Sequence, residues 1–394
     1  SGMNDGAGGS DVGSSWNASS TEITANGGDI TSSAGEKAPL DKPRFDHIRY
    51  VLVDRKASPP EVFMDKQSAQ YAALVWLTRD DPRQLDPESV YIAQRYGLAV
   101  LWFSTTKSGY EWHDVQDEKY YDDDDATDDE FDDDDEEEEE EGDNDRRKAK
   151  EVDPTKWFVH DNWLGSTGVC GWYGIRCFPH DNNGNVHDAK NDGDVSHIEL
   201  RRNNLHGLFP LELYTTLPYL RVLDLSDNGF AGTISEQVGH INWKGLESLN
   251  FTSNNIAGSI PSSIGKLSSL KELHLASNIL EESIPSSIGM LTGLRKLDLS
   301  GNSFKGSIPY EMGEMKQLSS LNLSYNLLLG PLPHEFSKLK KLVSLDVSRN
   351  NLGGPLITEL SDVTYLANLR LNDNHFSGEI PTAIGNLIHM EELQ

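Results

Sequence analysis

Few residues of this 394-residue chain stand at spacings that could support chemistry. Residues 188–193, followed by Glu199, have the outline of a calcium-binding loop, in which carboxylates at alternate positions supply oxygen ligands. Lys190 occupies one of the ligand positions, and Glu199 is needed in a predicted strand. We therefore predict no metal site there. The twelve histidines are scattered, and none recurs in register with a carboxylate.

The sequence lacks the motifs that would indicate catalysis. It contains no H-E-x-x-H, no G-x-S-x-G, no phosphate-binding G-x-x-x-x-G-K-[ST] and no protein kinase signature set. We therefore expect no enzymatic activity and no cofactor.

Two kinds of residue could carry covalent modifications. The only cysteines, Cys170 and Cys177, are either a local disulfide or two incidental thiols. Sequons for N-glycosylation begin at Asn17, Asn250 and Asn322. Glycans on the last two would obstruct the surface onto which they point. The alternative is that these sequons arise by chance in a segment rich in asparagine and serine.

The charge of the chain is concentrated in one block. Residues 122–145 hold 19 of the acidic residues, so the formal charge of −30 falls to about −11 outside that window, the difference between −30 and −19. Like charges at this density repel one another and favour a disordered loop. Because no basic stripe could neutralise phosphates, we exclude nucleic acid as a partner.

Composition divides the region before residue 194 into three parts. Residues 1–40 are rich in small polar residues and are predicted to be a disordered tail. Residues 41–193 are expected to form a helical N-terminal cap with an acidic, disordered insertion at 113–156. Apolar spacing predicts helices over 68–77 and 89–103, the second with Asp86 and Pro87 at its start.

No segment has the 18–20 apolar residues that a membrane span requires, and residues 1–40 lack the pattern of a signal peptide. The chain breaks off partway into a repeat at Gln394, with no cap for the apolar edge. We therefore expect the natural protein to continue into more repeats and a membrane span.

An internal repeat dominates the remainder of the chain. Its most regular residue is an asparagine, which recurs at intervals of 25, 26 and then 24 residues at Asn203, Asn228, Asn254, Asn278, Asn302, Asn326, Asn350 and Asn374. The frame L-x-x-L-x-L-x-x-N precedes most copies, as in Leu294, Leu297, Leu299 and Asn302. Repetition at one such period is typical of a solenoid.

The frame predicts how each coil is built. The alternation L-x-L is that of a strand with one buried face, so the leucines point inward and the intervening residues point outward. An inward asparagine can bond the backbone groups of the turn that follows, once in each coil. Residues 194–394 are therefore predicted to form eight repeats of the 24-residue type, truncated in a ninth, with strands stacked in a parallel sheet.

A second element, such as Gly306-Ser307-Ile308-Pro309, follows each asparagine and resembles the G-x-I-P element of plant-type leucine-rich repeats (LRRs). The segment 170–177, C-G-W-Y-G-I-R-C, is similar to the N-terminal cap motif of plant LRR ectodomains. The resemblance implies an α/β solenoid: a right-handed LRR superhelix with a parallel concave β-sheet and a helical cap closed by a Cys170–Cys177 disulfide. Such a bond implies an extracellular location.

Three coils depart from that pattern, with Glu282 in place of a glycine and Ser235 and Ile357 in place of prolines. We expect these coils to be locally irregular. Residues 96–112 together with 162–177 also resemble the cap of LRR proteins from diatoms, whose receptor-like proteins are the most similar, and from some bacteria. In those proteins the two segments lie closer in sequence.

The concave face is the usual ligand surface of the LRR fold, because its side chains are not needed for packing. Serine and threonine after each strand belong to the repeat pattern, which leaves the charged positions as candidate ligand contacts. These are Glu199, Arg201, Asp224, Glu272, His274, Lys296, Asp298, Asp346 and Arg370.

Two functions remain open from the sequence. One is a receptor-like ectodomain, extracellular or at the cell surface, that recognises a peptide, glycan or protein, with a co-receptor as a further partner. A membrane would be reached only through a segment outside this chain. The other is a secreted or cell-wall-associated structural or inhibitor-like protein whose acidic tract binds cations or basic matrix.

Overall fold

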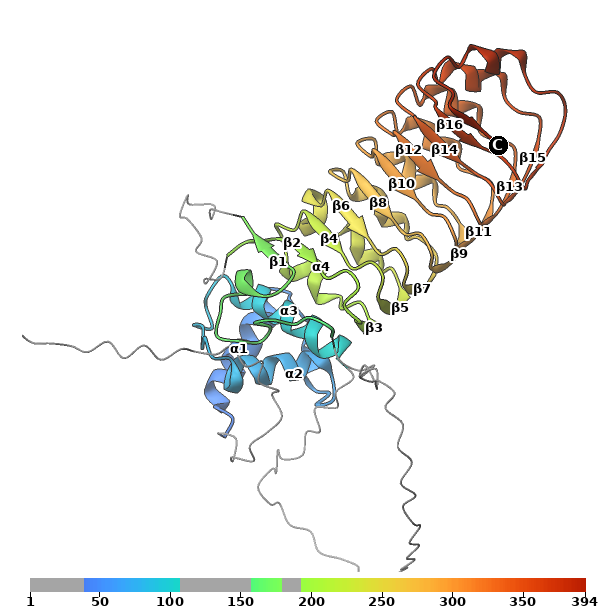
Figure 1. Ribbon diagram of the computed structural model, residues 1–394. Helices are drawn as coiled ribbons and strands as arrows, with labels where there is room; N and C mark the ends of the chain where they lie inside the picture. The colour runs from blue at the N-terminus through green and yellow to red at the C-terminus, as the bar shows by residue number, and fades with distance from the viewer. Residues whose placement is uncertain (1–38, 107–156, 179–192) are drawn as a thin grey trace, which may run out of the picture. The chain divides into compact units, whose positions relative to one another are not determined.

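The computed structural model describes residues 39–106, 157–178 and 193–394. Most of the predicted tail, the whole acidic insertion, Asn17 and residues 188–192 lie outside the described residues. Figure 1 shows the described elements, of which the earliest are helices and the later ones are stacked strands.

Three α-helices lie in the part of the cap that the structure describes. α1 (Lys42–Asp54) begins at Asp41, whose side chain accepts a hydrogen bond from the Arg44 backbone. It is followed by the 3₁₀ helix η1 (Pro60–Phe63), α2 (Ala69–Val75), the π-helical turn η2 (Trp76–Asp80) and α3 (Ile92–Thr105). α2 and α3 correspond to the two predicted helices, whereas α1 was not predicted. The predicted start of the later helix was wrong by three residues, because Asp86 instead closes a turn by accepting from the Glu88 N–H at 2.9 Å.

A buried ion pair lies at the centre of the cap. The Arg95 guanidinium donates to Asp81 at 2.6 and 2.8 Å, and both side chains are fully buried. It also lies 5.0 Å from the ring centroids of Trp76 and Trp172. The Cys170–Cys177 disulfide implied by the resemblance is confirmed. Trp172 lies within the segment that this bond closes, so the disulfide fixes one of the two tryptophans that contact Arg95.

The first sheet of the solenoid has ten strands, which lie side by side in Figure 1. β1 (Ile175–Cys177) pairs antiparallel with the next strand, and the others are parallel. These are β2 (Val195–Glu199), β4 (Val222–Asp224), β6 (Ser248–Asn250), β8 (Glu272–His274), β10 (Lys296–Asp298), β12 (Ser320–Asn322), β14 (Ser344–Asp346), β16 (Asn368–Arg370) and β18 (Glu392–Leu393). The predicted fold class, a solenoid of leucine-rich repeats with a parallel sheet, is confirmed.

Each coil also contributes to a second parallel sheet, which was not predicted. Its eight strands are β3 (His206–Leu208), β5 (Gly229–Thr233), β7 (Asn255–Gly258), β9 (Ile279–Ser283), β11 (Ser303–Gly306), β13 (Leu327–Gly330), β15 (Asn351–Gly354) and β17 (His375–Phe376). Single-turn helices join the sheets: α4 (Glu212–Thr216), η4 (Glu236–Gly239), η5 (Ile241–Gly245), η6 (Ser262–Lys266), η7 (Ser286–Met290), η8 (Tyr310–Glu314), η9 (His334–Lys338), η10 (Thr358–Asp362) and η11 (Thr382–Asn386). A further 3₁₀ helix, η3 (Val169–Gly171), lies before β1.

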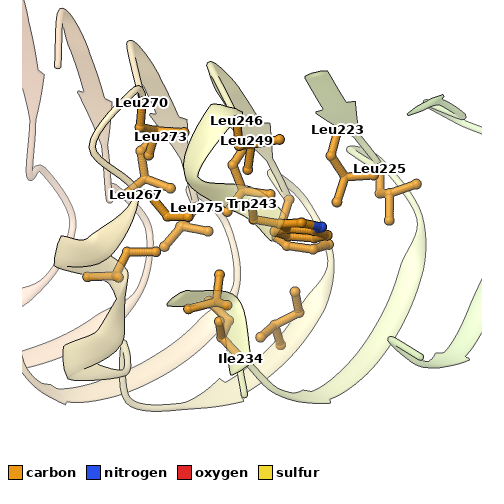
Figure 2. Close-up of a cluster of buried hydrophobic side chains, with 14 of the residues drawn as sticks. Leu223, Leu225, Ile234, Trp243, Leu246, Leu249, Leu267, Leu270, Leu273 and Leu275 are labelled. Atoms are coloured by element: carbon orange, nitrogen blue, oxygen red, sulfur yellow. The ribbon is translucent and has the colours of Figure 1, made fainter. Parts of the chain in front are cut away.

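The core of the solenoid is a continuous stack of inward leucines. Figure 2 shows Leu249 and Leu273 from successive strands, with Trp243 packed among them, and all three are fully buried. Four of the 3₁₀ helices closely approach the next coil at a glycine, namely at Gly239, Gly265, Gly289 and Gly313. A Cβ atom at Gly289 would lie 2.3 Å from the Glu311 carbonyl oxygen of the next coil, so a larger residue at this position would force one of the two coils to shift.

The ladder asparagines bond one coil to the next. In the fifth copy, Asn302 Nδ2 donates to the carbonyls of Leu275, Leu299 and Ser300 at 2.9–3.2 Å. Its Oδ1 accepts from the Leu280 N–H at 3.0 Å. Asn203 differs, because its side chain bonds the backbone of Val159 in the cap.

The coils of Glu282 and Ile357 keep a regular path, which contradicts the irregularity expected of them. The coil of Ser235 does depart from the others, because it carries two 3₁₀ helices, η4 and η5, where each later coil carries one. Ser235 and Ile357 precede 3₁₀ helices with the extended backbone that proline adopts elsewhere. Glu282 takes a φ of +64°, close to the +74° of Gly306, the glycine of the next coil. The backbone therefore follows the repeat even where the residue type opposes it.

Replacement of Glu282 by glycine is expected to raise the free energy of unfolding by about 0.5–1 kcal/mol. A positive φ costs a non-glycine residue roughly 1–2 kcal/mol, which the greater entropy of unfolded glycine offsets only in part. Chemical denaturation measures the change. Glu281→Gly, at a strand position with no positive φ, is the matched control and should lower stability. A loss of stability in both variants would contradict this assignment.

Candidate binding surface

The candidate ligand contacts fall into two rows on the solvent-facing side of the ten-stranded sheet, which we call the concave face. The pairing register places Glu272 and Lys296 in the first row. The second row contains Glu199, Asp224, His274, Asp298, Asp346 and Arg370. Arg201 lies beyond the end of β2 and donates to Asp227 at 2.8 Å, so it belongs to neither row.

Sequence reasoning missed part of the first row. His197, Ser248, Ser320, Ser344, Asn368 and Glu392 are in register with Glu272 and Lys296. The signal was present in the sequence, because each of these residues directly precedes the middle leucine or isoleucine of the frame.

The aspartates of the second row hold the ends of their own strands. Asp298 Oδ1 accepts from the backbone N–H of Ser300 at 3.0 Å and from its hydroxyl at 2.6 Å. Asp224 and Asp346 make the same two bonds to Ser226 and Ser348. These carboxylates therefore have a structural role, which the interpretation of them as ligand contacts did not include.

A charged cluster occupies the middle of the concave face. Lys296 Nζ lies 2.9 Å from Glu272 Oε1, and His274 Nε2 lies 3.7 Å from Glu272 Oε2. Burial works to raise the pKa of Glu272, but the hydrogen bond and charge of Lys296, with His274, hold it below its ordinary value. Asp298 stands beside His274 in the register. The cluster thus combines two carboxylates, an ammonium and an imidazole on two strands.

Two other groups of charges lie toward the ends of the sheet. Arg176 on β1 pairs with Glu199. Arg370 donates to both carboxylate oxygens of Glu392 at 3.1 and 2.9 Å, and lies 3.7 Å from Asp346. These pairs also raise the pKa of Arg370. Most charged candidates are thus already paired with a neighbouring strand, which lowers their net attraction for a single charged ligand.

The two sequons within the described residues lie in the second row. Asn322 Oδ1 accepts from the backbone and hydroxyl of Ser324 at 3.1 and 2.8 Å. Asn250 Oδ1 accepts from the Thr252 N–H at 3.0 Å. Both side chains therefore stand at strand ends on the surface where a glycan would obstruct ligand access.

Within residues 39–106, 157–178 and 193–394, no three side chains of the types that bind metals are grouped as a site. Helices of the described part are all too short or too polar to cross a membrane.

Models of the leucine rich repeat match residues 244–304 and 292–352, and a second model of the same description matches 219–241 and 365–387. The chain is similar to three Arabidopsis thaliana proteins. Receptor like protein 24 is 44% identical over 71 residues, or 18% of this chain and 8% of that protein. Phytosulfokine receptor 1 is 34% identical over 107 residues, or 26% and 9%.

MDIS1-interacting receptor like kinase 1 is 32% identical over 144 residues, or 32% of this chain and 13% of that protein. The chain therefore spans only 8–13% of the length of these relatives. Among solved structures, the chain is similar to the LRR ectodomain of the Arabidopsis thaliana receptor kinase GASSHO1/SCHENGEN3, solved in complex with CASPARIAN STRIP INTEGRITY FACTOR 2. The identity is 28% and the TM-score is 0.49, and the match covers 56% of this chain and 28% of that one. A plant ice-binding protein gives 25% identity and a TM-score of 0.49, covering 59% and 78%.

Proposed function

We propose that the chain is the ligand-recognition part of an extracellular LRR receptor-like protein, which binds a peptide or protein through the concave face and catalyses nothing. The observation that carries the proposal is the set of polar and charged side chains on the ten-stranded sheet. In each strand only the middle residue is buried in the core, and the residues on either side of it face solvent. A surface that packing does not require is available for a partner.

The matching segments of proteins named as receptors and receptor-like proteins support a role in recognition. The Cys170–Cys177 bond supports an extracellular location, because disulfides persist in oxidising compartments. A glycan ligand or a co-receptor is compatible with the same surface.

Panning of a random peptide library against the protein tests the proposal. Selected peptides should bind the Glu272→Ala/Lys296→Ala variant at least tenfold more weakly, a loss of about 1.4 kcal/mol. The matched control is Glu314→Ala/Lys338→Ala, which removes an exposed cross-coil pair of 2.8 Å from the 3₁₀ helices instead of the sheet. Affinity in this control should not change.

Unchanged affinity in the Glu272→Ala/Lys296→Ala variant would contradict binding through the concave face. Binding retained by a peptide of residues 113–156 alone would instead favour the second function, a secreted or wall-associated protein that acts through its acidic tract.

A further inference from the structure

One hydrogen bond recurs at the ends of the strands of the concave face. In β4, β6, β10, β12 and β14, the aspartate or asparagine of the second row accepts the backbone N–H two residues later, at 2.9–3.1 Å. This bond satisfies a donor that the turn leaves without a ladder partner. Three strands lack it, because the second-row residue is Glu199, His274 or Arg370.

The consequence is clearest in β8. The residue two positions after His274 is Ala276, which is 5% exposed. The structure gives its backbone N–H no acceptor among the residues described. Its counterparts in the flanking strands, Thr252 and Ser300, are both bonded. A donor left without a partner costs folding free energy unless something outside the chain satisfies it.

β8 also differs from the other two exceptions. Glu199 and Arg370 are engaged by Arg176 and Glu392 on the neighbouring strands, toward the two ends of the sheet. Among the described residues, the single polar contact of the His274 side chain is with Glu272 at 3.7 Å, and this side chain is 25% exposed. It lies in the middle of the concave face, where the residues that contribute most to a binding interface usually cluster.

We infer that the ligand itself supplies the missing acceptor, with an amide carbonyl oxygen that bonds the Ala276 N–H beside the His274 ring. The carbonyl would take the position that the Asp298 carboxylate oxygen has in the next coil. This inference rests on the proposed function and identifies the group of the ligand that the centre of the surface recognises. His274 is then a specificity-determining residue, because an aspartate in its place would fill the site.

The charges around Ala276 favour an uncharged carbonyl over a carboxylate as the acceptor that the ligand supplies. Glu272 and Asp298 both border the site, and the nearest ammonium, on Lys296, is held by Glu272 at 2.9 Å. A ligand carboxylate would face two like charges against one neutralised cation, which is unfavourable at these separations. An amide oxygen is a strong acceptor and carries no net charge.

Restoring the aspartate–serine pair of the repeat at the end of β8 tests, without any ligand, whether the Ala276 N–H lacks an acceptor. The variant His274→Asp/Ala276→Ser should increase the equilibrium constant for folding roughly tenfold. The new side chains would form, within β8 and its turn, the same two bonds that Asp298 and Ser300 form in the next coil. The matched reverse exchange, Asp298→His/Ser300→Ala, should decrease it by a similar factor. In wild-type protein, the Ala276 amide should exchange with deuterium at least tenfold faster than that of Ser300. Equal exchange rates, or no gain of stability in the restored variant, would overturn the inference.

Titration with two small probes tests the recognised group. In protein labelled with ¹⁵N-alanine, N-methylacetamide should shift the Ala276 amide resonance, whereas acetate should not. The shift should be lost in His274→Asp/Ala276→Ser, in which the residue 276 amide is followed by ¹⁵N-serine labelling. A stronger response to acetate, or no response to either probe, would overturn the assignment of an amide carbonyl. Peptide binding that depends on Glu272 and Lys296 could still hold in that case, so failure here is distinguishable from failure of the proposed function.

Discussion

Replacement of Arg95 by methionine is expected to lower the free energy of unfolding by about 3–5 kcal/mol, the usual cost of breaking a buried ion pair. The substitution leaves the Asp81 carboxylate without its two charged donors at a site where neither side chain is exposed. It also removes the cation that lies 5.0 Å from the ring centroids of Trp76 and Trp172. Urea denaturation followed by circular dichroism measures the loss.

Two further variants distinguish the buried charge from the loss of packing. The double variant Asp81→Leu/Arg95→Met removes both charges and should recover most of the lost stability. Arg49→Met breaks an exposed pair with Asp46 at 3.2 Å and should cost less than about 0.5 kcal/mol. If the double variant is no more stable than Arg95→Met, the buried carboxylate is not the origin of the loss.

Replacement of Asn302 by alanine is expected to cost about 3 kcal/mol. The side chain makes four bonds to backbone groups: three carbonyls receive its amide protons, and the Leu280 N–H donates to its oxygen. Each buried group left without a partner costs roughly 1–3 kcal/mol, and the coil can relax only in part because its neighbours fix the stacking distance. Chemical denaturation gives the value.

Asp298→Ala is the control on the same strand, and we expect it to cost about 1 kcal/mol. From the frame alone this side chain would face only solvent, where substitutions have little effect. The structure gives it two bonds from Ser300, so the loss is moderate. Equal losses for Asn302→Ala and Asp298→Ala would mean that the inward and outward positions have been exchanged.

The solenoid could be predicted from the sequence because its determinants repeat. One period fixes the strand, the inward leucines and the asparagine ladder, and each copy supports the others. The same period also places residue 272 beside residue 296, so the Glu272–Lys296 pair could have been read from the spacing of 24. The two outward rows were mixed because each strand has only three residues, with an outward position on either side of its middle leucine.

The cap has no repeat to support its prediction. α1 carries Phe45, Ile48, Val51 and Leu52 at helical spacing, but charged residues between them obscured the pattern. The Arg95–Asp81 pair could not be predicted, because its burial involves Trp172, which is distant in sequence, as well as Trp76. The Ala276 N–H without an acceptor could be recognised only from the strand register and from the hydrogen bonds of the neighbouring coils.

The placement of tryptophan gives the two ends of the described chain different optical signals. Five tryptophans, at positions 76, 102, 157, 163 and 172, lie within ring-contact distance of one another in the cap. A sixth, Trp243, is buried in an early coil. Residues 244–394 contain none. Intrinsic fluorescence therefore reports the opening of the cap and the first coils, while circular dichroism averages over every coil. A change at Asn302 that frays the distal repeats alone would shift the dichroism transition and leave the emission transition in place.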